Sequence, residues 1–239
     1  VVYSLAMTYP HVRITVLSRG FARPFFDDLA PNVSFMEADI KGEYRGIKGL
    51  NALYRRLVAK KPTAVADFHG VLRSTYLRMR FNMERFRVEH INKHRSGKRA
   101  LTSSSDKRMV QQPTSFDNYA EVLARLGYPI KLQFSSIFGN EGGDLSLLPA
   151  AIGKRNEGEQ WIGIAPFAAH KGKVYPPEMM ERVIDLIEEN NPHCRIFLFG
   201  RGRDESHTFP EWCARHSHCI FVGDHLDTMR QELVLMSHL

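Results

Sequence analysis

The sequence predicts an α/β protein with two doubly wound lobes. Short apolar runs alternate with longer segments whose apolar residues recur at helical spacing, which is typical of a parallel sheet covered by helices. This alternation stops in a glycine-rich stretch at residues 131–160 and then restarts. We therefore expect a first lobe over residues 1–130, a passage between domains over 131–160, and a second, partial lobe over 161–239.

The first lobe is expected to open inside a helix, because VVYSLAMTYP is mostly apolar and carries no initiating Met. From this opening we expect that the chain begins after the natural start of the protein. Pro62 ends the second predicted helix, and Ser115 and Gly127 are the predicted N-cap and C-terminal stop of the last one. The strands are expected at 12–17, 33–36, 63–68 and 86–91, and the helices at 21–30, 50–59, 71–81 and 115–126.

The second lobe repeats the alternation over a shorter length. Its strands are expected at 161–165, 195–199 and 219–222, and its helices at 177–190, 204–215 and 227–237. A complete lobe of this kind has more strands, so we expect the sheet to be unfinished.

Composition excludes several classes of protein. A hydrophobic content of 43% supports real cores, so a disordered or fibrous chain is excluded. No run of about 18 apolar residues is present, and the opening lacks the basic head of a secretory leader. Three cysteines, Cys194, Cys213 and Cys219, are too few and too clustered for a disulfide framework, which favours the reducing cytoplasm.

Positive charge is concentrated in the first lobe. Residues 1–160 hold 25 Lys and Arg against 15 acids, whereas residues 161–239 hold 8 against 11. The excess peaks in a basic stripe at residues 73–108, with 11 Lys and Arg against 3 acids. Such a stripe can bind nucleic acid, an anionic lipid surface or a phosphorylated ligand, or it can be a solvated face without a partner.

The loop APFAAHKGK, which follows the strand expected at 161–165, is a candidate anion site. Ala168, Ala169 and Gly172 leave room for backbone amides to approach a ligand, and the next helix directs its positive N-terminus there. Lys171 and Lys173 add full charges that suit a diphosphate. These residues predict either a site for a nucleotide-linked donor or a surface loop with solvated lysines. They match neither GxxxxGK[ST] nor GxGxxG, so neither an NTPase nor a dehydrogenase is indicated.

A second candidate loop, LFGRGRDES, follows the strand expected at 195–199. Gly200 and Gly202 permit a tight turn, and Asp204 or Glu205 could accept hydrogen bonds from a ribose or a base. Alternatively, these acids only favour the start of a helix.

Three motifs together resemble the family 9 glycosyltransferases, the ADP-heptose:lipopolysaccharide heptosyltransferases. They are DFHGVLRS at 67–74, IGIAPFAAHKGKVYPPE at 162–178 and FLFGRGRDE at 197–205. The resemblance implies a GT-B architecture of two Rossmann-like lobes and an inverting, metal-independent transfer. The donor would be a nucleotide sugar such as ADP-heptose, acting as substrate, with no cofactor. The acceptor would be a lipopolysaccharide core or lipid A, with peripheral contact to an anionic membrane surface and no nucleic acid.

Site residues carried over from this family fall on both lobes. Lys173 corresponds to the lysine that contacts the donor phosphate, and Glu205 or Asp204 to the acid that meets the nucleoside. The loop that lines the phosphate comprises Ala168, Ala169 and His170, and the residues that border the acceptor are His69, Arg73 and Ser74.

Two segments of the family pattern have no counterpart in the chain. One is an opening strand with a Gly-Asp loop, whose Asp is the expected general base and would lie before Val1. The other is a downstream Asp-Ser/Thr-Gly segment with a His, which would follow Leu239. From these two differences we expect an enzyme truncated at both ends.

Three other interpretations remain beside the transferase. The segment CARHSHC suggests zinc, but its cysteines are too far apart for a CxxC knuckle. Asp67 and His69 suggest acid/base chemistry, although Asp67 follows a buried strand and suits a structural role equally well. Finally, the stripe at 73–108 could make the chain a nonenzymatic nucleic-acid-binding module. Against this, Tyr76, Phe81 and Phe86 recur at near-helical spacing and are better explained as core.

Overall fold

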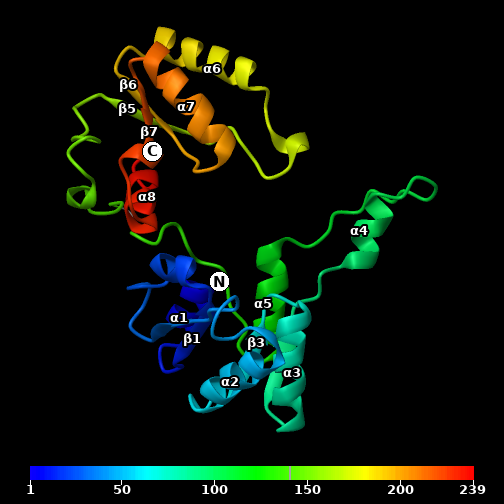
Figure 1. Cartoon of the computed structure of the whole chain (residues 1–239). Coiled ribbons are helices and arrows are strands. Elements are labelled where there is room, and N and C mark those ends of the chain that lie inside the picture. Colours follow the sequence, from blue (N-terminus) through cyan, green and yellow to red (C-terminus); the bar gives the residue numbers. More distant parts are fainter. Residues whose placement is uncertain (140) are drawn as a thin grey trace. The chain divides into compact units, whose positions relative to one another are not determined.

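The computed structural model describes residues 1–139 and 141–239, which divide into two compact units (Figure 1). The first unit is Val1–Ser135 and the second is Ser136–Leu239. Position 140, which falls in the expected passage 131–160, lies outside the described residues. Two residues of that passage, Leu148 and Ile152, are buried in the core of the second unit.

The first unit alternates helices with parallel strands, as the sequence predicts. The strands are β1 (Ile14–Ser18), β2 (Val33–Glu37), β3 (Ala64–Asp67) and β4 (Arg87–His90). The helices are α1 (Val2–Thr8), α2 (Gly46–Val58), α3 (Leu72–Met83), α4 (Arg95–Leu101) and α5 (Ser115–Arg125).

The strands of the first unit form two separate parallel pairs, β1 with β2 and β3 with β4. In the part of the chain that the structure describes, β1 and β3 are not hydrogen-bonded to each other. Strands inside a parallel sheet are covered on both faces, so their side chains are expected to be fully buried. Here no residue of β1 is buried, and Asp67 is the only buried residue of β3. The sheet of the first unit is therefore less complete than the sequence pattern predicts.

The core of the first unit forms where α2 covers β2. Leu53 of α2 packs with Met36, Ala38 and Tyr44, and all four are at most 5% exposed. Aromatic contacts extend this core, because the Phe81 ring of α3 lies 4.8 Å from Tyr54 and 5.3 Å from Phe86. The expectation that Phe81 and Phe86 serve packing is confirmed.

Local details differ from the prediction in three places. The helix expected at 21–30 is a short 3-10 helix, Gly20–Phe25, because it contains Pro24 and is followed by Asp28 in a left-handed conformation. The N-cap of α5 is Thr114 rather than Ser115, and Thr114 and Asp117 form a reciprocal capping box. Helix α4 was not predicted, because it has no apolar face and buries no residue.

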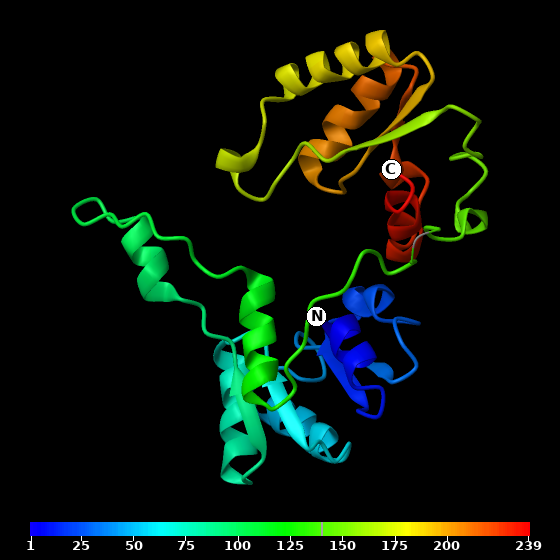
Figure 2. The same ribbon diagram turned by 180° about the vertical axis from the view of Figure 1, so that it is seen from behind.

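The second unit is a three-layered α/β structure (Figure 2). Its sheet has the order β5-β6-β7, and every pairing is parallel. The strands are β5 (Gln160–Ile164), β6 (Cys194–Leu198) and β7 (Cys219–Phe221), and the helices are α6 (Pro177–Asn190), α7 (Arg203–Arg215) and α8 (Met229–Met236).

Alternation along β6 fixes which helices cover each face of this sheet. Ile196 and Leu198 face a cluster that includes Ile184 of α6 and Phe209 and Trp212 of α7. Phe197 faces the opposite cluster, which includes Val234 and Leu235 of α8. Both faces of the sheet are therefore covered by helices, and the loops at the strand ends extend from a well-packed sheet.

No helix among the described residues is both long enough and apolar enough to cross a bilayer.

Candidate functional site

Three loops of the second unit emerge at the carboxyl edge of its sheet. Ile164 of β5 pairs with Leu198 of β6, which pairs with Phe221 of β7, so the three strands end side by side. The amide of Phe199 donates to the carbonyl of Ile164 at 2.8 Å and keeps the first two loops together as they leave the sheet. In open parallel sheets this edge is where ligands bind. The structure thus brings the two sequence-predicted loops to one edge.

The first loop presents its small residues and its charges to solvent. Ala168, Ala169, His170, Lys171 and Lys173 are all exposed. Within the described residues, the amides of Ala168 and Ala169 donate to no protein acceptor, whereas the amide of Lys173 donates to the carbonyl of His170 at 2.9 Å. The loop therefore offers two unused backbone donors beside two lysines, the combination that an anionic ligand needs.

Helix α6 begins directly after this loop without a side-chain cap. Pro176 is its N-cap residue and Pro177 its first residue, and proline suits this position because the first amides of a helix have no intrahelical partner. The helix is 14 residues long. Its positive end and the lysines of the loop add to the same electrostatic potential.

The second loop forms a tight turn that is filled by Glu205. The Glu205 side chain lies directly against both Gly200 and Gly202, and the positive φ of 151° at Gly200 also favours glycine there. Glu205 is half-buried against this turn, while Asp204 is exposed in the first turn of α7. Of the two predicted acids, Asp204 is thus the more accessible to a ligand.

A third loop, Val222–Asp224, was not singled out from the sequence. A Cβ atom on Gly223 would lie 3.5 Å from the carbonyl of Gly200, so the two turns run side by side. Arg201 ties them to α8, with its Nε donating to Glu232 Oε1 at 2.8 Å and its guanidinium also reaching the carbonyl of Leu226. Arg201 and Arg203 are both exposed, and Arg201 is the one held by these contacts. A glycine next to an acid at 223–224 is the sequence signal for the third loop.

The predicted acceptor residues lie in the first unit, where β3 leads into α3. His69 and Arg73 are exposed. The Ser74 hydroxyl is already engaged, because it accepts from the amide of Val71 and donates to the carbonyl of Val71, both at 3.0 Å. His69 and Arg73 are therefore available to a ligand, whereas Ser74 fixes the start of the helix.

Asp67 has a structural role in this segment. Its side chain is 6% exposed and lies 3.1 Å from Arg78 Nε in an ion pair. Its other oxygen accepts hydrogen bonds from the amides of His69 and Gly70 at 2.9 and 3.0 Å. These contacts hold the loop in place and leave no free carboxylate for acid/base chemistry.

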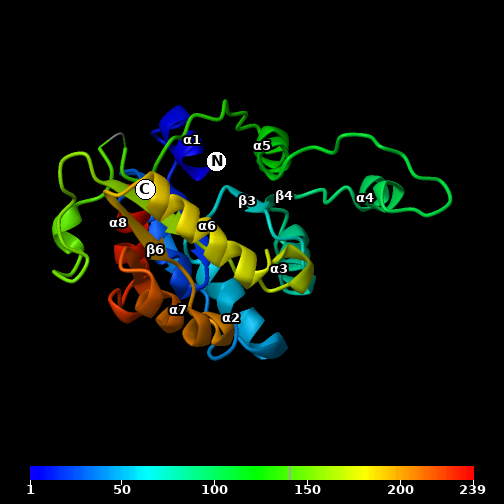
Figure 3. The ribbon, with the colours of Figure 1, turned by 90° about the horizontal axis from the view of Figure 1, so that it is seen from above.

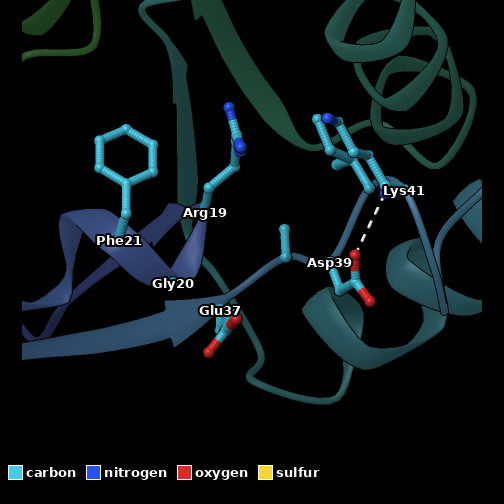
Figure 4. Close-up of a pocket in the computed structure, with 8 residues that line it drawn as sticks. Arg19, Gly20, Phe21, Glu37, Asp39 and Lys41 are labelled. Atoms are coloured by element: carbon cyan, nitrogen blue, oxygen red, sulfur yellow. Dashed lines mark hydrogen bonds between the residues drawn. The ribbon is translucent and has the colours of Figure 1, made fainter. Parts of the chain in front are cut away.

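A separate hollow of about 410 Å³ opens at the carboxyl edge of β1 and β2 (Figure 4). Arg19 and Phe21 line one side, and Glu37, Asp39 and Lys41 line the other. Hydrogen bonds from the amides of Lys41 and Gly42 lower the pKa of the Asp39 carboxyl. The sequence did not single out these residues, because neither flanking segment carries a recognisable motif.

In the His- and Cys-containing segment CARHSHC, His216 and Cys219 are buried. Among the described residues, no group of three or more His, Cys, Asp or Glu side chains is arranged to hold a metal ion. His216 is buried between Glu188 and Glu181, with ring nitrogens 3.0 and 3.4 Å from their carboxylates. Burial raises the pKa of the Cys219 thiol to about 12, and burial also raises the pKa of Cys194 and of Cys213. None of these thiols is an activated nucleophile.

The basic stripe at 73–108 divides into cations that serve the fold and cations that face solvent. Arg78 pairs with Asp67, Arg80 donates to Asn51 and lies over the Tyr54 ring, and Arg87 donates to the carbonyl of Leu126. Arg87 is itself exposed despite its contact, and the other exposed cations are Arg73, Arg85, Arg95, Lys98, Arg99, Lys107 and Arg108.

Comparison with known proteins finds a solved structure of similar fold. No protein-family model matches the chain, and no curated protein matches it by sequence. Among solved structures, the chain is similar to one described as the glycosyl transferase family 9 from Veillonella parvula DSM 2008, with a TM-score of 0.57 and 18% sequence identity. The match covers 87% of this chain and 61% of that protein. The chain therefore shares the α/β fold of this protein and spans less than two thirds of its length.

Proposed function

We propose that this chain acts as, or within, a glycosyltransferase that takes its sugar from a nucleotide diphosphate donor. The observation that carries the proposal is the convergence of two loops at one sheet edge. One loop offers Lys171, Lys173 and two unused amides, and the other a glycine turn that leads into exposed Asp204. The shared fold with a family 9 glycosyl transferase supports the same conclusion.

The proposed donor site suits the chemistry of the leaving group. In the transfer, the bond from the anomeric carbon to the acceptor oxygen forms as the bond to the nucleotide diphosphate breaks. Negative charge builds on the departing diphosphate, and Lys171, Lys173 and the N-terminus of α6 would stabilise it. Asp204, or less directly Glu205, would accept hydrogen bonds from the nucleoside.

We further propose the finer assignment that the sequence resemblance implies. The sugar would be a heptose carried by ADP, the acceptor a lipopolysaccharide core or lipid A, and the transfer inverting and metal-independent. Exposed His69 and Arg73 would border the acceptor. The general base is not assigned to any residue of this chain.

The alternative, a nucleic-acid-binding module, receives no specific support. Phe81 and Phe86 are committed to the core, and Tyr76 donates its hydroxyl to Asn51 at 2.9 Å. The aromatic side chains of the stripe thus offer no stacking surface for bases.

Replacing Lys173 with alanine tests the proposal. A charge-assisted contact to phosphate is worth about 1.5–3 kcal/mol, so Lys173→Ala should weaken ADP binding roughly tenfold or more. Titration calorimetry on the whole chain measures the affinity. Because Lys173 is exposed, the variant should keep the thermal unfolding temperature of the parent.

Lys154→Ala is the matched control, because Lys154 is an exposed lysine of the same unit outside the three loops. It should bind ADP as the parent does. Equal ADP affinity in the parent and in Lys173→Ala, or no affinity for any nucleoside diphosphate in the parent, would refute the proposed donor site.

A further inference from the structure

Residues 92–113 form an arm between β4 and α5, with α4 as its only helix. The arm extends away from the body of the first unit (Figure 3), and the view of Figure 1 agrees. No residue of α4 is buried. The backbone hydrogen bonds that shape the arm close within it, such as the one from the Arg108 amide to the carbonyl of Ala100 at 3.0 Å. Folding of the first unit therefore does not account for the arm.

The arm carries six Lys and Arg against one acid. Five of the six are exposed, namely Arg95, Lys98, Arg99, Lys107 and Arg108. Asp106, the single acid, pairs with Arg108 at 3.1 Å, and both side chains are at least 70% exposed, so this ion pair is weak. Unlike Arg78, Arg80 and Arg87, the cations of the arm remain available to an anionic partner.

Large apolar side chains are exposed beside these cations. On the arm itself, Met109 is 77% and Val110 is 61% exposed. At the first turns of α3 and α5, Leu72 is 91% and Phe116 is 62% exposed. Isolated exposed apolar residues are common, but here two lie on the basic arm and two at helix starts of the same unit.

The two helix starts lie at the sheet edge from which the arm departs. Helix α3 follows the carboxyl end of β3 directly. Helix α5 runs antiparallel to β4, because Arg87 at the start of β4 donates to the carbonyl of Leu126, just after the end of α5. The starts of both helices therefore lie at the carboxyl edge of β3 and β4, where the arm begins.

We propose that the arm, together with Leu72 and Phe116, is a docking surface for an anionic lipid bilayer. The cations would be attracted to the headgroups, and the aliphatic and aromatic tips would enter the interface, which is how peripheral proteins combine the two contributions. Lipid fits better than nucleic acid, because three of the four exposed apolar side chains, Leu72, Met109 and Val110, are not aromatic, which leaves Phe116 as the one ring of this surface on which a base could stack. This inference concerns the first unit alone and does not depend on the proposed sugar transfer.

Vesicle sedimentation tests the docking surface. The whole chain should sediment with vesicles of equal parts phosphatidylglycerol and phosphatidylcholine, not with pure phosphatidylcholine vesicles, and salt should weaken the binding. Each basic residue near such a surface contributes about 1 kcal/mol, so Lys98→Gln with Arg99→Gln should weaken binding roughly thirtyfold. The double variant Met109→Ser, Val110→Ser should also bind the vesicles more weakly than the parent, and this loss of affinity should be the same at low and at high salt.

The matched control is Arg55→Gln with Lys60→Gln, which removes the same charge from exposed positions of the same unit. This control should bind the vesicles nearly as the parent does. The proposal is overturned if the arm and control variants lose binding equally, if the parent does not bind anionic vesicles, or if it binds a single-stranded oligonucleotide instead. ADP affinity should be unchanged in the arm variants, which separates this result from a failure of the donor site.

Discussion

At the scale of single residues, the Glu159 carboxylate holds in place the segment that leads into β5, an edge strand of the second unit's sheet. Glu159 Oε1 accepts from Arg195 Nε at 2.9 Å, and its Oε2 accepts from Arg195 at 2.7 Å and from the Trp161 indole at 2.8 Å. Arg195 also donates to the carbonyls of Ile152 and Lys154. The network fastens the segment before β5 onto β6, and hydrogen bonds from Arg195 lower the pKa of Glu159 to about 2.

This network predicts a stability effect that depends on pH. Glu159→Gln should lower the free energy of unfolding by about 2 kcal/mol near neutral pH, because it removes charge-assisted hydrogen bonds to a largely buried arginine. The folded pKa lies below the ordinary value of about 4.3, so the contribution is complete above that value and is lost as the pH falls toward 2. Urea titrations of parent and variant should therefore differ near neutral pH and converge in acid.

Glu157→Gln is the control for this experiment, because Glu157 is exposed and belongs to the same loop. It should match the parent at every pH. A parent–variant difference for Glu159→Gln that persists unchanged to the lowest pH would contradict the role assigned to the carboxylate.

At the scale of secondary-structure elements, helix starts are satisfied in two ways. Helices α5 and α8 carry capping boxes, built by Thr114 with Asp117 and by Thr228 with Gln231. Helices α6 and α7 have no side-chain cap, and both start at the candidate donor edge. Helices α2 and α4 also begin without a side-chain cap, so what distinguishes α6 and α7 is that their starts lie at the carboxyl edge of the sheet.

The capping box of α5 predicts a moderate loss of stability. Thr114→Ala should lower the free energy of unfolding by about 1 kcal/mol, because it removes the hydroxyl that accepts from the Asp117 amide at 3.2 Å. Ser115→Ala, at the position that the sequence suggested as N-cap, should have a much smaller effect. Chemical denaturation of both variants checks the assignment, and a larger loss for Ser115→Ala would contradict it.

At the scale of the whole molecule, the two units differ in how completely their strands are covered. Four of the five residues of β6 are buried, and apolar clusters lie on both of its faces. In β1, by contrast, none of the five residues is buried, and β1 and β3 belong to separate two-stranded pairs. Protection from solvent should follow this difference.

Hydrogen exchange measured by mass spectrometry checks this expectation. Amides of β6 should exchange at least tenfold more slowly than those of β1 and β3, a difference of about 1.4 kcal/mol in local opening. Peptides from α4 should exchange fastest among the helices, because that helix has no buried face. Equal protection of β1 and β6 would contradict this expectation, because it would mean that β1 is shielded from solvent by contacts other than its strand pairing.

The sequence by itself determined the α/β class, most strands and helices, and the two loops that are candidates for ligand binding. Periodicity is sufficient for this, because the spacing of apolar residues within a segment such as 195–199 or 177–190 already indicates whether the segment forms a strand or a helix. Where local pattern was weak, as in α4, or misleading, as at Pro24, the prediction was missing or wrong.

Only the tertiary structure decided which residues are free to act. The sequence presented Asp67 and Ser74 as candidates beside Lys173, yet Asp67 is engaged by Arg78 and Ser74 by the backbone of Val71. It also presented the basic stripe as one feature, which the structure divides into cations engaged by the fold and cations that face solvent, most of the latter on the arm. The physical reason is that hydrogen-bond and ion-pair partners are distant in sequence or set by local geometry, so availability follows from packing and not from residue type.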